Sequence, residues 1–165
     1  MTQSKADLES WYQRRDPWDL MQSADDHYRR RCILSVLSMY GPFERALDIG
    51  AGEGFISGSL PADEINGYEI SDTAAARFPP HVHRTLHPTG RANYDLVLAT
   101  GILYQQYDWQ LFVDMIKTHA SDVILTCNIA TWEVPQAIAE IPGRQVVDMT
   151  FAYREFTQRL RVFKV

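Results

Sequence analysis

Ten residues at positions 46–55, Ala-Leu-Asp-Ile-Gly-Ala-Gly-Glu-Gly-Phe, carry the strongest structural signal in the chain. A short apolar strand runs directly into three alternate glycines, Gly50, Gly52 and Gly54. Glycine adopts positive φ readily and lets the backbone approach a ligand closely. We predict a following helix over 55–60, and we expect its N-terminus and the amides of the glycine turn to bind an anion such as a phosphate or a carboxylate. The pattern therefore predicts a ligand-binding turn.

Two acidic residues flank this turn. Asp48 lies in the strand before it, next to the last residue Ile49, and Glu69 lies 19 residues after Gly50, in the next predicted strand, 65–70. A carboxylate at the position of Glu69 accepts hydrogen bonds from a ribose diol. Asp48 would repel a pyrophosphate, whereas it suits the ammonium and sulfonium groups of S-adenosylmethionine. The turn and its acids favour that cofactor, and we expect Ile70 to contact it as well.

The rest of the chain alternates between strand and helix patterns. The further elements are expected as helices at 5–13, 24–40, 72–78 and 109–120, strands at 82–86, 94–99 and 122–127, and a terminal hairpin of 145–156 with 158–165. Strands that alternate with helices indicate a doubly wound parallel sheet. The predicted fold class is thus α/β, a three-layer Rossmann-like sheet that is mostly parallel, with an antiparallel C-terminal strand and N-terminal helices.

Composition restricts the class of function. The chain has 165 residues, of which 45% are hydrophobic, and this fits one domain with a full core. Its 16 Lys and Arg against 21 Asp and Glu give a net charge of −5, which argues against nucleic-acid binding. No apolar run reaches the ~18–20 residues of a membrane span, so we expect a cytoplasmic protein without a membrane partner. Cys32 and Cys127 are too few for a cysteine zinc site, and we predict no metal.

The motifs together resemble those of the class I (Rossmann-like) S-adenosylmethionine-dependent methyltransferases. Residues 46–55 match the first motif of that family, Glu69 matches the acid after its second strand, and 93–99 match its fourth strand. The terminal hairpin matches its reversed last strand. The resemblance covers about residues 44–165 and implies S-adenosylmethionine as the cofactor.

A narrower resemblance lies at the N-terminus and after the fourth strand. Arg15-Asp-Pro-Trp18, the following helix with Arg31, and Thr100-Gly-Ile-Leu-Tyr-Gln105 are similar to the NodS-like methyltransferases, which N-methylate a glucosamine amine of a chitooligosaccharide. In that group the Asp-Pro-Trp segment and the next helix fold over the cofactor. The loop after the fourth strand reads Glu-Val-Leu-Tyr-Tyr there, so this chain lacks the glutamate and one of the two tyrosines.

Candidate site residues follow from these motifs. The predicted cofactor-binding residues are Asp48, Gly50, Gly52, Gly54, Glu69, Ile70, Leu86, Ala99, Trp18 and Arg31, with the stretch around Leu86 and His87 expected at the adenine. His27 and Tyr104 are the candidates for a catalytic base or for orienting the acceptor, and a packing role for His27 is an equal alternative. Tyr12, Tyr28 and Trp132 are predicted to bind the substrate through their aromatic faces.

The predicted protein is one methyltransferase domain, 1–165, with a helical lid over 1–43 and a cofactor-binding core over 44–165. We expect transfer of a methyl group to an amine or hydroxyl of a small molecule such as a saccharide or natural product. The core leaves no room for a substrate domain, so the acceptor pocket must come from the lid, from strand-end loops or from a second subunit, and a homodimer stays open. The alternatives are an NAD(P)-dependent reductase and a cofactor-binding partner or sensor domain without catalysis.

Overall fold

The structure is a computed structural model, and it describes residues 3–86 and 93–165. The elements in chain order are α1 (Lys5–Trp11), α2 (Ala24–Leu37), β1 (Phe43–Ile49), η1 (Ser57–Ser59), β2 (Ala62–Tyr68), α3 (Asp72–Ala75), β3 (Val82–Thr85), β4 (Tyr94–Thr100), α4 (Trp109–His119), β5 (Ala120–Ile129), α5 (Pro135–Ala139), β6 (Arg144–Tyr153) and β7 (Phe156–Lys164). Helices α1 and α2 begin where the sequence predicts, because Ser4 and Ser23 each accept a hydrogen bond from the third helical amide.

All seven strands form one sheet in the order β3-β2-β1-β4-β5-β7-β6. Strands β1 to β5 pair in parallel, whereas β7 runs antiparallel between β5 and β6. The strand order reverses between β1 and β4, and open α/β sheets bind their ligands at such a reversal, beyond the carboxyl ends of the strands. The predicted fold class is confirmed, including the antiparallel C-terminal strand.

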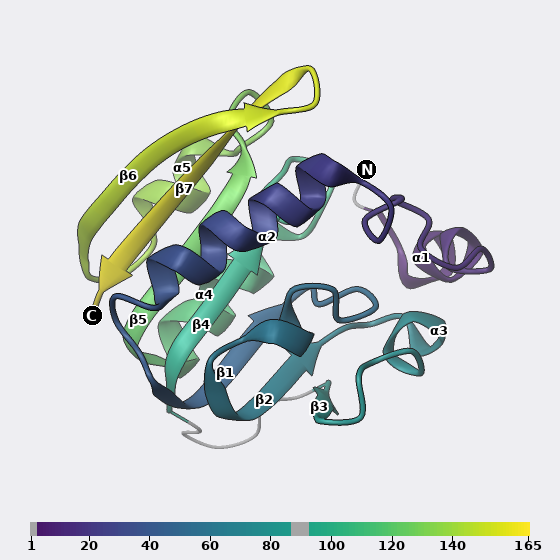
Figure 1. Ribbon diagram of the computed structural model, residues 1–165, viewed down its shortest axis with the longest axis horizontal. Coiled ribbons are helices and arrows are strands. Elements are labelled where there is room, and N and C mark those ends of the chain that lie inside the picture. The colour runs from purple at the N-terminus through teal and green to yellow at the C-terminus, as the bar shows by residue number, and fades with distance from the viewer. Residues whose placement is uncertain (1–2, 87–92) are drawn as a thin grey trace.

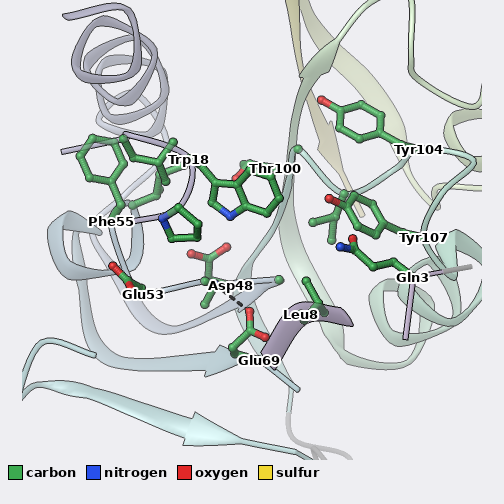
Figure 2. Close-up of a pocket in the computed structure, with 18 of the residues that line it drawn as sticks. Gln3, Leu8, Trp18, Asp48, Glu53, Phe55, Glu69, Thr100, Tyr104 and Tyr107 are labelled. Carbon is green, nitrogen blue, oxygen red and sulfur yellow. Dashed lines mark hydrogen bonds between the residues drawn. The ribbon is translucent and has the colours of Figure 1, made fainter. Parts of the chain in front are cut away.

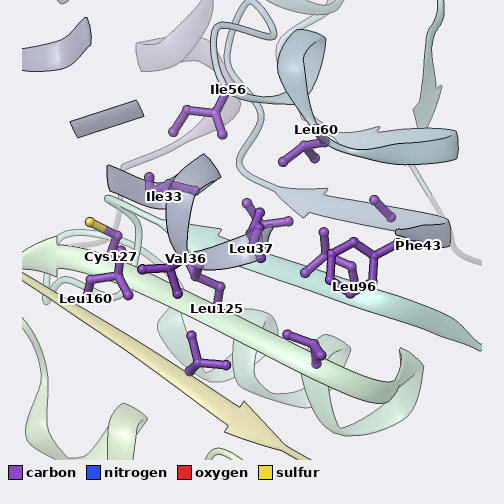
Figure 3. Packing of buried hydrophobic residues seen from close by; sticks show 14 of the residues in the cluster. Ile33, Val36, Leu37, Phe43, Ile56, Leu60, Leu96, Leu125, Cys127 and Leu160 are labelled. Carbon is purple, nitrogen blue, oxygen red and sulfur yellow. The ribbon is translucent and has the colours of Figure 1, made fainter. Parts of the chain in front are cut away.

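Helices cover both faces of the sheet (Figure 1), with α2 on one face and α4 and α5 on the other. Alternate residues of β4 serve the two sides, because successive side chains of a strand point to opposite faces. Leu96 and Leu98 pack beneath α2, and Val97 packs with α4. Figure 3 shows the hydrophobic cluster between α2 and the sheet, where Ile33 and Leu37 of α2 lie over the strands.

The helix predicted over 55–60 is wrong. The chain there forms turns followed by the three-residue 3₁₀ helix η1. Gly54 has a φ of +83°, which stops a helix from starting at the turn, and Gly58 with Pro61 leaves little helix-forming sequence after it. The turn after β1 is therefore not followed by the predicted α-helix N-terminus.

Other differences concern element ends. Helix α3 covers four residues rather than 72–78, and α2 ends at Leu37 rather than at position 40. Strand β2 starts at Ala62 and ends before Glu69, so Glu69 and Ile70 lie in the loop after the strand. Helix α5, which has five residues and begins with Pro135 at its first position, is not predicted from the sequence. In the part of the chain that the structure describes, every helix is too short or too polar to cross a lipid bilayer.

Candidate functional site

The glycine turn after β1 is held by its own backbone. Gly50 and Gly52 have φ values of +73° and +58°, which a residue with a side chain rarely adopts. The amide of Gly50 donates to the carbonyl of Tyr68 at 2.9 Å, and the amide of Gly54 donates to the carbonyl of Ala51 at 2.9 Å. A Cβ atom on Gly50 would lie 2.5 Å from Cγ2 of Ile102. Only glycine fits at this position.

Glu69 joins the turn to the loop after β2. Its Oε2 accepts a hydrogen bond from the amide of Gly52 at 2.9 Å, and its Oε1 accepts one from the amide of Ser71 at 2.8 Å. The side chain is 6% exposed, and burial raises the pKa of Glu69 while these two hydrogen bonds oppose that shift. Each carboxylate oxygen keeps one lone pair for a further donor, such as a ribose hydroxyl.

The three glycine amides are therefore already used inside the protein, two by backbone carbonyls and one by Glu69. The expectation that the turn offers these glycine amides to an anion is wrong, because two backbone carbonyls and the Glu69 carboxylate already accept hydrogen bonds from them. At Gly50 and Gly52 the turn instead offers backbone without a side chain, against which a ligand can lie closely.

Asp48 is the second acid of the site, at the carboxyl end of β1. It is 2% exposed, and Ser57 Oγ donates a hydrogen bond to its Oδ2 at 2.5 Å. Burial raises the pKa of Asp48 to about 6, and the hydrogen bond and the positive charge of Arg29 partly oppose the shift. Asp48 is thus a buried carboxylate that a cationic group would stabilise in its ionised form.

These residues line a cavity of about 490 Å³ at the point where the strand order reverses. The N-terminal segment covers it through Tyr12 and Trp18, whose indole N–H donates to the Tyr12 hydroxyl at 3.5 Å. Figure 2 shows Asp48 and Glu69 on one side of the cavity and Tyr104 on the other. The predicted residues that the structure brings together on this cavity are Tyr12, Trp18, Asp48, Gly50, Gly52, Glu69, Ile70, Tyr104 and Trp132.

The side of the cavity near β5 and β6 is aromatic. The hydroxyl oxygen of Tyr104 accepts a hydrogen bond from the amide of Ile129 at 2.8 Å, and Trp132 packs edge-on against its ring at 5.9 Å between centroids. Burial raises the pKa of Tyr104 far above its usual value. Tyr104 is therefore protonated near neutral pH and can donate a hydrogen bond from its hydroxyl.

Three predicted residues of α2 lie away from the cavity. One ring nitrogen of His27 lies 2.9 Å from the carbonyl oxygen of Met21, and the other lies 3.2 Å from Arg30. Both ring nitrogens thus have partners inside the protein, which favours the packing role of His27 over a catalytic role. Tyr28 is exposed and packs edge-on against Phe151. Arg31 is exposed as well, with its guanidinium 5.9 Å from the Tyr28 ring.

Three other predicted residues also lie outside the lining. Gly54 packs toward Pro79, which a Cβ atom would approach to 2.6 Å. Ala99 is fully buried in the core beside α4, because it points to the opposite face of β4 from Leu98. Leu86 is 40% exposed at the end of β3, and its neighbour His87 is outside the described residues.

The structure adds lining residues that the motifs did not reveal. Arg29 comes from the same arginine run as Arg31, but positions two residues apart on a helix point about 200° apart, and only Arg29 reaches the cavity. Tyr153 and Gln158 come from the terminal hairpin, and Tyr107 follows β4. A helical wheel fixed on buried Ile33 places Arg29 on the same side, since the two residues are one turn apart.

Within residues 3–86 and 93–165, no three His, Cys, Asp or Glu side chains gather closely enough to hold a metal ion. Nε2 of His81 lies 3.1 Å from the carbonyl oxygen of Gly58.

Solved structures share this fold over nearly the whole chain. The N-methyltransferase NodS from Bradyrhizobium japonicum WM9, in complex with S-adenosyl-L-homocysteine, matches with a TM-score of 0.81 and 17% identity, over 98% of each chain. Magnesium protoporphyrin IX methyltransferase from Synechocystis PCC 6803, with bound S-adenosylmethionine, matches with a TM-score of 0.69 and 12% identity, over 97% of this chain and 96% of that chain. No family model and no curated protein matches the sequence.

The arrangement of strands and helices is therefore the class I S-adenosylmethionine-dependent methyltransferase fold. The fold that the motifs at 46–55 and Glu69 implied is confirmed, and NodS is among the proteins that share it.

Proposed function

We propose that this protein is an S-adenosylmethionine-dependent methyltransferase that acts on an amine or hydroxyl of a small molecule. The observation that carries the proposal is the charge of the cavity, whose described lining has five acidic side chains and one basic one. The acids are Asp16, Asp48, Glu53, Glu69 and Asp108, and the base is Arg29. Glu53 is already paired with Arg77, and the buried acids Asp48 and Glu69 favour a cofactor with a permanent positive charge and a ribose diol.

The cofactor would lie across the ends of β1 and β2. Glu69 has free lone pairs for the ribose hydroxyls, and the side-chain-free turn at Gly50 and Gly52 gives the nucleoside close access to the backbone. Asp48 would face the ammonium and sulfonium groups. Tyr12 and Trp18 would cover the cofactor from the N-terminal segment, which supports the proposed division into a lid, 1–43, and a core, 44–165.

The bound cofactor supplies a methyl group that its positive sulfur already activates. The protein would hold the acceptor in line with that methyl group and exclude water, and alignment of this kind supplies much of the catalysis. Tyr104 would orient the acceptor as a hydrogen-bond donor. His27 is not placed to act as a base, and Tyr104 is protonated near neutral pH. The site therefore fits an acceptor that reacts as a neutral amine, or one that releases its proton to solvent.

The size of the cavity supports a small acceptor. Ligand pockets commonly range from about 300 to 1,000 Å³. At about 490 Å³ this cavity is in the lower half of that range, and the cofactor must share it with the acceptor. The aromatic side formed by Tyr104, Trp132 and Tyr153 would pack against a flat ring, either a sugar or an aromatic system.

An NAD(P)-dependent reductase is the first alternative. It is disfavoured because a pyrophosphate would meet Asp48 and Glu69 at a turn whose glycine amides are already used and which no α-helix follows.

Methyl transfer itself is the direct test. The purified protein is incubated with S-adenosylmethionine and a panel of small amines, phenols and amino sugars, and S-adenosylhomocysteine is quantified. We expect acceptor-dependent product with at least one amine or hydroxyl compound, and none with the Glu69→Ala variant. Tight binding of S-adenosylhomocysteine without transfer to any acceptor would favour the alternative of a partner or sensor domain.

A further inference from the structure

The two ends of the cavity differ in chemistry. Its buried acids, Asp48 and Glu69, lie near the ends of β1 and β2, where the nucleoside would bind. Figure 2 shows Tyr104 at the opposite end, which lies beyond β5 and the terminal hairpin. We call this the hairpin end, and its lining residues are Tyr104, Ile129, Trp132, Tyr153 and Gln158. None of these five side chains carries a charge near neutral pH.

Two acids lie behind the hairpin end, and both are neutralised inside the protein. Glu133 has both carboxylate oxygens 2.7 Å from Nη1 of Arg161. Asp26 accepts hydrogen bonds from the Tyr153 hydroxyl at 2.9 Å and from Nη2 of Arg154 at 2.8 Å. Burying an ammonium group without a partner is costly. In the described part of the hairpin end, a protonated amine would therefore meet no unpaired carboxylate.

Gln158 is the buried carboxamide of the hairpin end. It comes from β7, is 1% exposed, and its Oε1 accepts a hydrogen bond from Sγ of Cys127 at 3.4 Å. Burial raises the pKa of the Cys127 thiol to about 12, so the thiol is protonated and is the donor in this contact. The contact leaves the two N–H groups of Nε2 without an acceptor among the described residues. A buried donor without a partner is uncommon, and on a cavity wall it indicates a ligand.

Tyr104 supplies a second unused donor. Its hydroxyl oxygen accepts a hydrogen bond from the amide of Ile129 at 2.8 Å, and no described residue accepts the hydroxyl proton in turn. Ile129 is also the residue that faces Gln158 across the pairing of β5 with β7. Both unused donors therefore adjoin Ile129, and a single acceptor atom of a ligand is the natural partner for them.

The rest of the hairpin end is aromatic. Trp132 packs against Phe156 with 4.8 Å between ring centroids and edge-on against Tyr104 at 5.9 Å, and these contacts hold its indole in place. Aromatic walls of this kind pack well against a flat aromatic ring. A sugar carries hydroxyl groups around its whole ring, and these need donors and acceptors on several sides. Two unused donors and no free carboxylate in the described lining suit an aromatic ring with one oxygen better.

We propose that the hairpin end binds a phenol as the methyl acceptor, with the Tyr104 hydroxyl and Nε2 of Gln158 donating hydrogen bonds to the phenolic oxygen. This inference rests on the proposed function and deepens it, because it names the substrate class of the same cavity. Of the amine and hydroxyl acceptors that the proposed function allows, it selects an aromatic hydroxyl. Gln158 is thus the residue that determines specificity for oxygen.

The two donors also have a chemical role in the transfer. A phenol has a pKa of about 10 in water, so it is mostly protonated near neutral pH. Donors aimed at its oxygen stabilise the negative charge that develops as the proton leaves to solvent. The phenolate oxygen then forms a bond to the methyl carbon, the bond between that carbon and sulfur breaks, and its electron pair stays on sulfur. The products are an aryl methyl ether and S-adenosylhomocysteine.

Matched acceptors test the substrate class. The purified protein is incubated with S-adenosylmethionine and a panel of phenols, the anilines with the same ring substituents, and amino sugars. We expect methyl transfer to phenols to be at least about tenfold faster than to the matching anilines, the value of one donor to a developing charge. Mass spectrometry identifies the methyl ether. Faster transfer to anilines or to amino sugars would overturn the proposal.

A coloured phenol tests the donors without turnover. 4-Nitrophenol changes its absorbance when it ionises, and it is titrated with pH in the presence of the protein saturated with S-adenosylhomocysteine. We expect binding to lower the pKa of 4-nitrophenol by about one unit or more, because both donors favour the anion. Gln158→Met should remove about half of this shift and slow transfer to phenols by about tenfold to a hundredfold, while the affinity for S-adenosylhomocysteine stays within about twofold.

Gln145→Met is the matched control, because Gln145 is an exposed residue of β6 and is not part of the cavity lining. It should leave the shift, the transfer rate and the affinity unchanged. Tyr104→Phe removes the other donor and tests the proposal even if Gln158→Met does not fold. Circular dichroism checks the fold of each variant.

The outcomes separate this inference from the function on which it rests. If the protein binds S-adenosylhomocysteine but neither methylates a phenol nor shifts the pKa of 4-nitrophenol, the phenol site is wrong and the cofactor site stands. A shift that persists in folded Gln158→Met and Tyr104→Phe would show that these side chains do not contact the phenolic oxygen. If the unmodified protein does not bind S-adenosylhomocysteine, the proposed function itself fails, and the inference fails with it.

Discussion

The carboxylate of Glu69 accepts a hydrogen bond from the backbone amide of Gly52 at 2.9 Å. This contact ties the loop after β2 to the turn after β1, so the ribose acceptor and the glycine surface are positioned together. Because Glu69 is buried and already oriented by backbone donors, it would bind a ribose diol with little loss of side-chain entropy. The two strongest signals of the sequence thus form one unit in the structure.

Glu69→Ala should weaken binding of S-adenosylhomocysteine by more than about a hundredfold, because two hydroxyl contacts to a charged acceptor are lost together. Isothermal calorimetry measures the affinity. Glu64→Ala is the control, since Glu64 lies on β2 but is exposed and pairs with Arg45 on the surface. Unchanged affinity in Glu69→Ala would contradict the assignment of the ribose site.

Gly52→Val should also abolish cofactor binding. Its φ of +58° is unfavourable for valine, and a Cβ atom would lie 3.1 Å from the Tyr12 hydroxyl on the cavity side. A thermal melt distinguishes loss of binding from loss of fold. A Gly52→Val protein that melts cooperatively and still binds S-adenosylhomocysteine normally would show that the cofactor does not lie against the turn.

Binding of S-adenosylmethionine should weaken as the pH falls through about 6. The pKa of Asp48 is raised to about 6 by burial, so the carboxylate is ionised above that pH and neutral below it. The sulfonium keeps its charge throughout, and it loses an ionic partner when Asp48 takes up a proton. Between pH 7 and 5, the affinity of the native protein for S-adenosylmethionine should fall as the pH falls. The affinity of Asp48→Asn should not show this fall. Equal pH dependence in both proteins would contradict the role of Asp48.

The same raised pKa affects stability. Folded Asp48 holds its proton up to about pH 6, whereas its unfolded form releases it near its ordinary value of 3.8. The unfolded state therefore binds fewer protons between these values, and the contribution of Asp48 to stability falls as the pH rises through that window. Urea unfolding should show Asp48→Asn gaining stability relative to the native protein between pH 4 and 6. A constant difference across that range would contradict the shift.

Asp26 should contribute strongly to stability. Asp26→Ala removes a buried carboxylate from the Tyr153 hydroxyl and from two guanidinium groups, and breaking such a buried cluster typically costs about 3–5 kcal/mol. Urea unfolding gives the free energy. Asp25→Ala is the control, because Asp25 is the exposed neighbour in the same helical turn. Similar small losses in both variants would show that the cluster contributes little.

The strands and the glycine turn could be predicted because their signals are local. Apolar runs define the strands, and an acid in the right place after the second strand indicates a nucleoside site. The helix over 55–60 failed for a local reason too, since the same glycines that form the turn prevent helix formation. The missing helix mattered, because the expected anion site depended on it.

Residues that reach the cavity from outside the motifs could not be assigned from the sequence. Arg29 and Arg31 look alike in an arginine run, and the signal that separates them is indirect, because Arg29 lies one turn from Ile33, which packs on the sheet. Tyr153 and Gln158 reach the cavity because β6 and β7 turn back beside β5, a relationship between distant segments. His27 was selected for its chemistry, but its neighbours on α2 and in the preceding loop use both ring nitrogens.

The central claim is that the cavity binds an adenosine nucleoside joined through sulfur to an amino acid, as in S-adenosylmethionine and S-adenosylhomocysteine, rather than a dinucleotide. Calorimetric titration of the unmodified protein with S-adenosylhomocysteine and, separately, with NAD⁺ and NADP⁺ tests it most directly. We predict saturable one-to-one binding of S-adenosylhomocysteine and no measurable heat of binding with either dinucleotide. Binding of a dinucleotide without binding of S-adenosylhomocysteine would contradict the account.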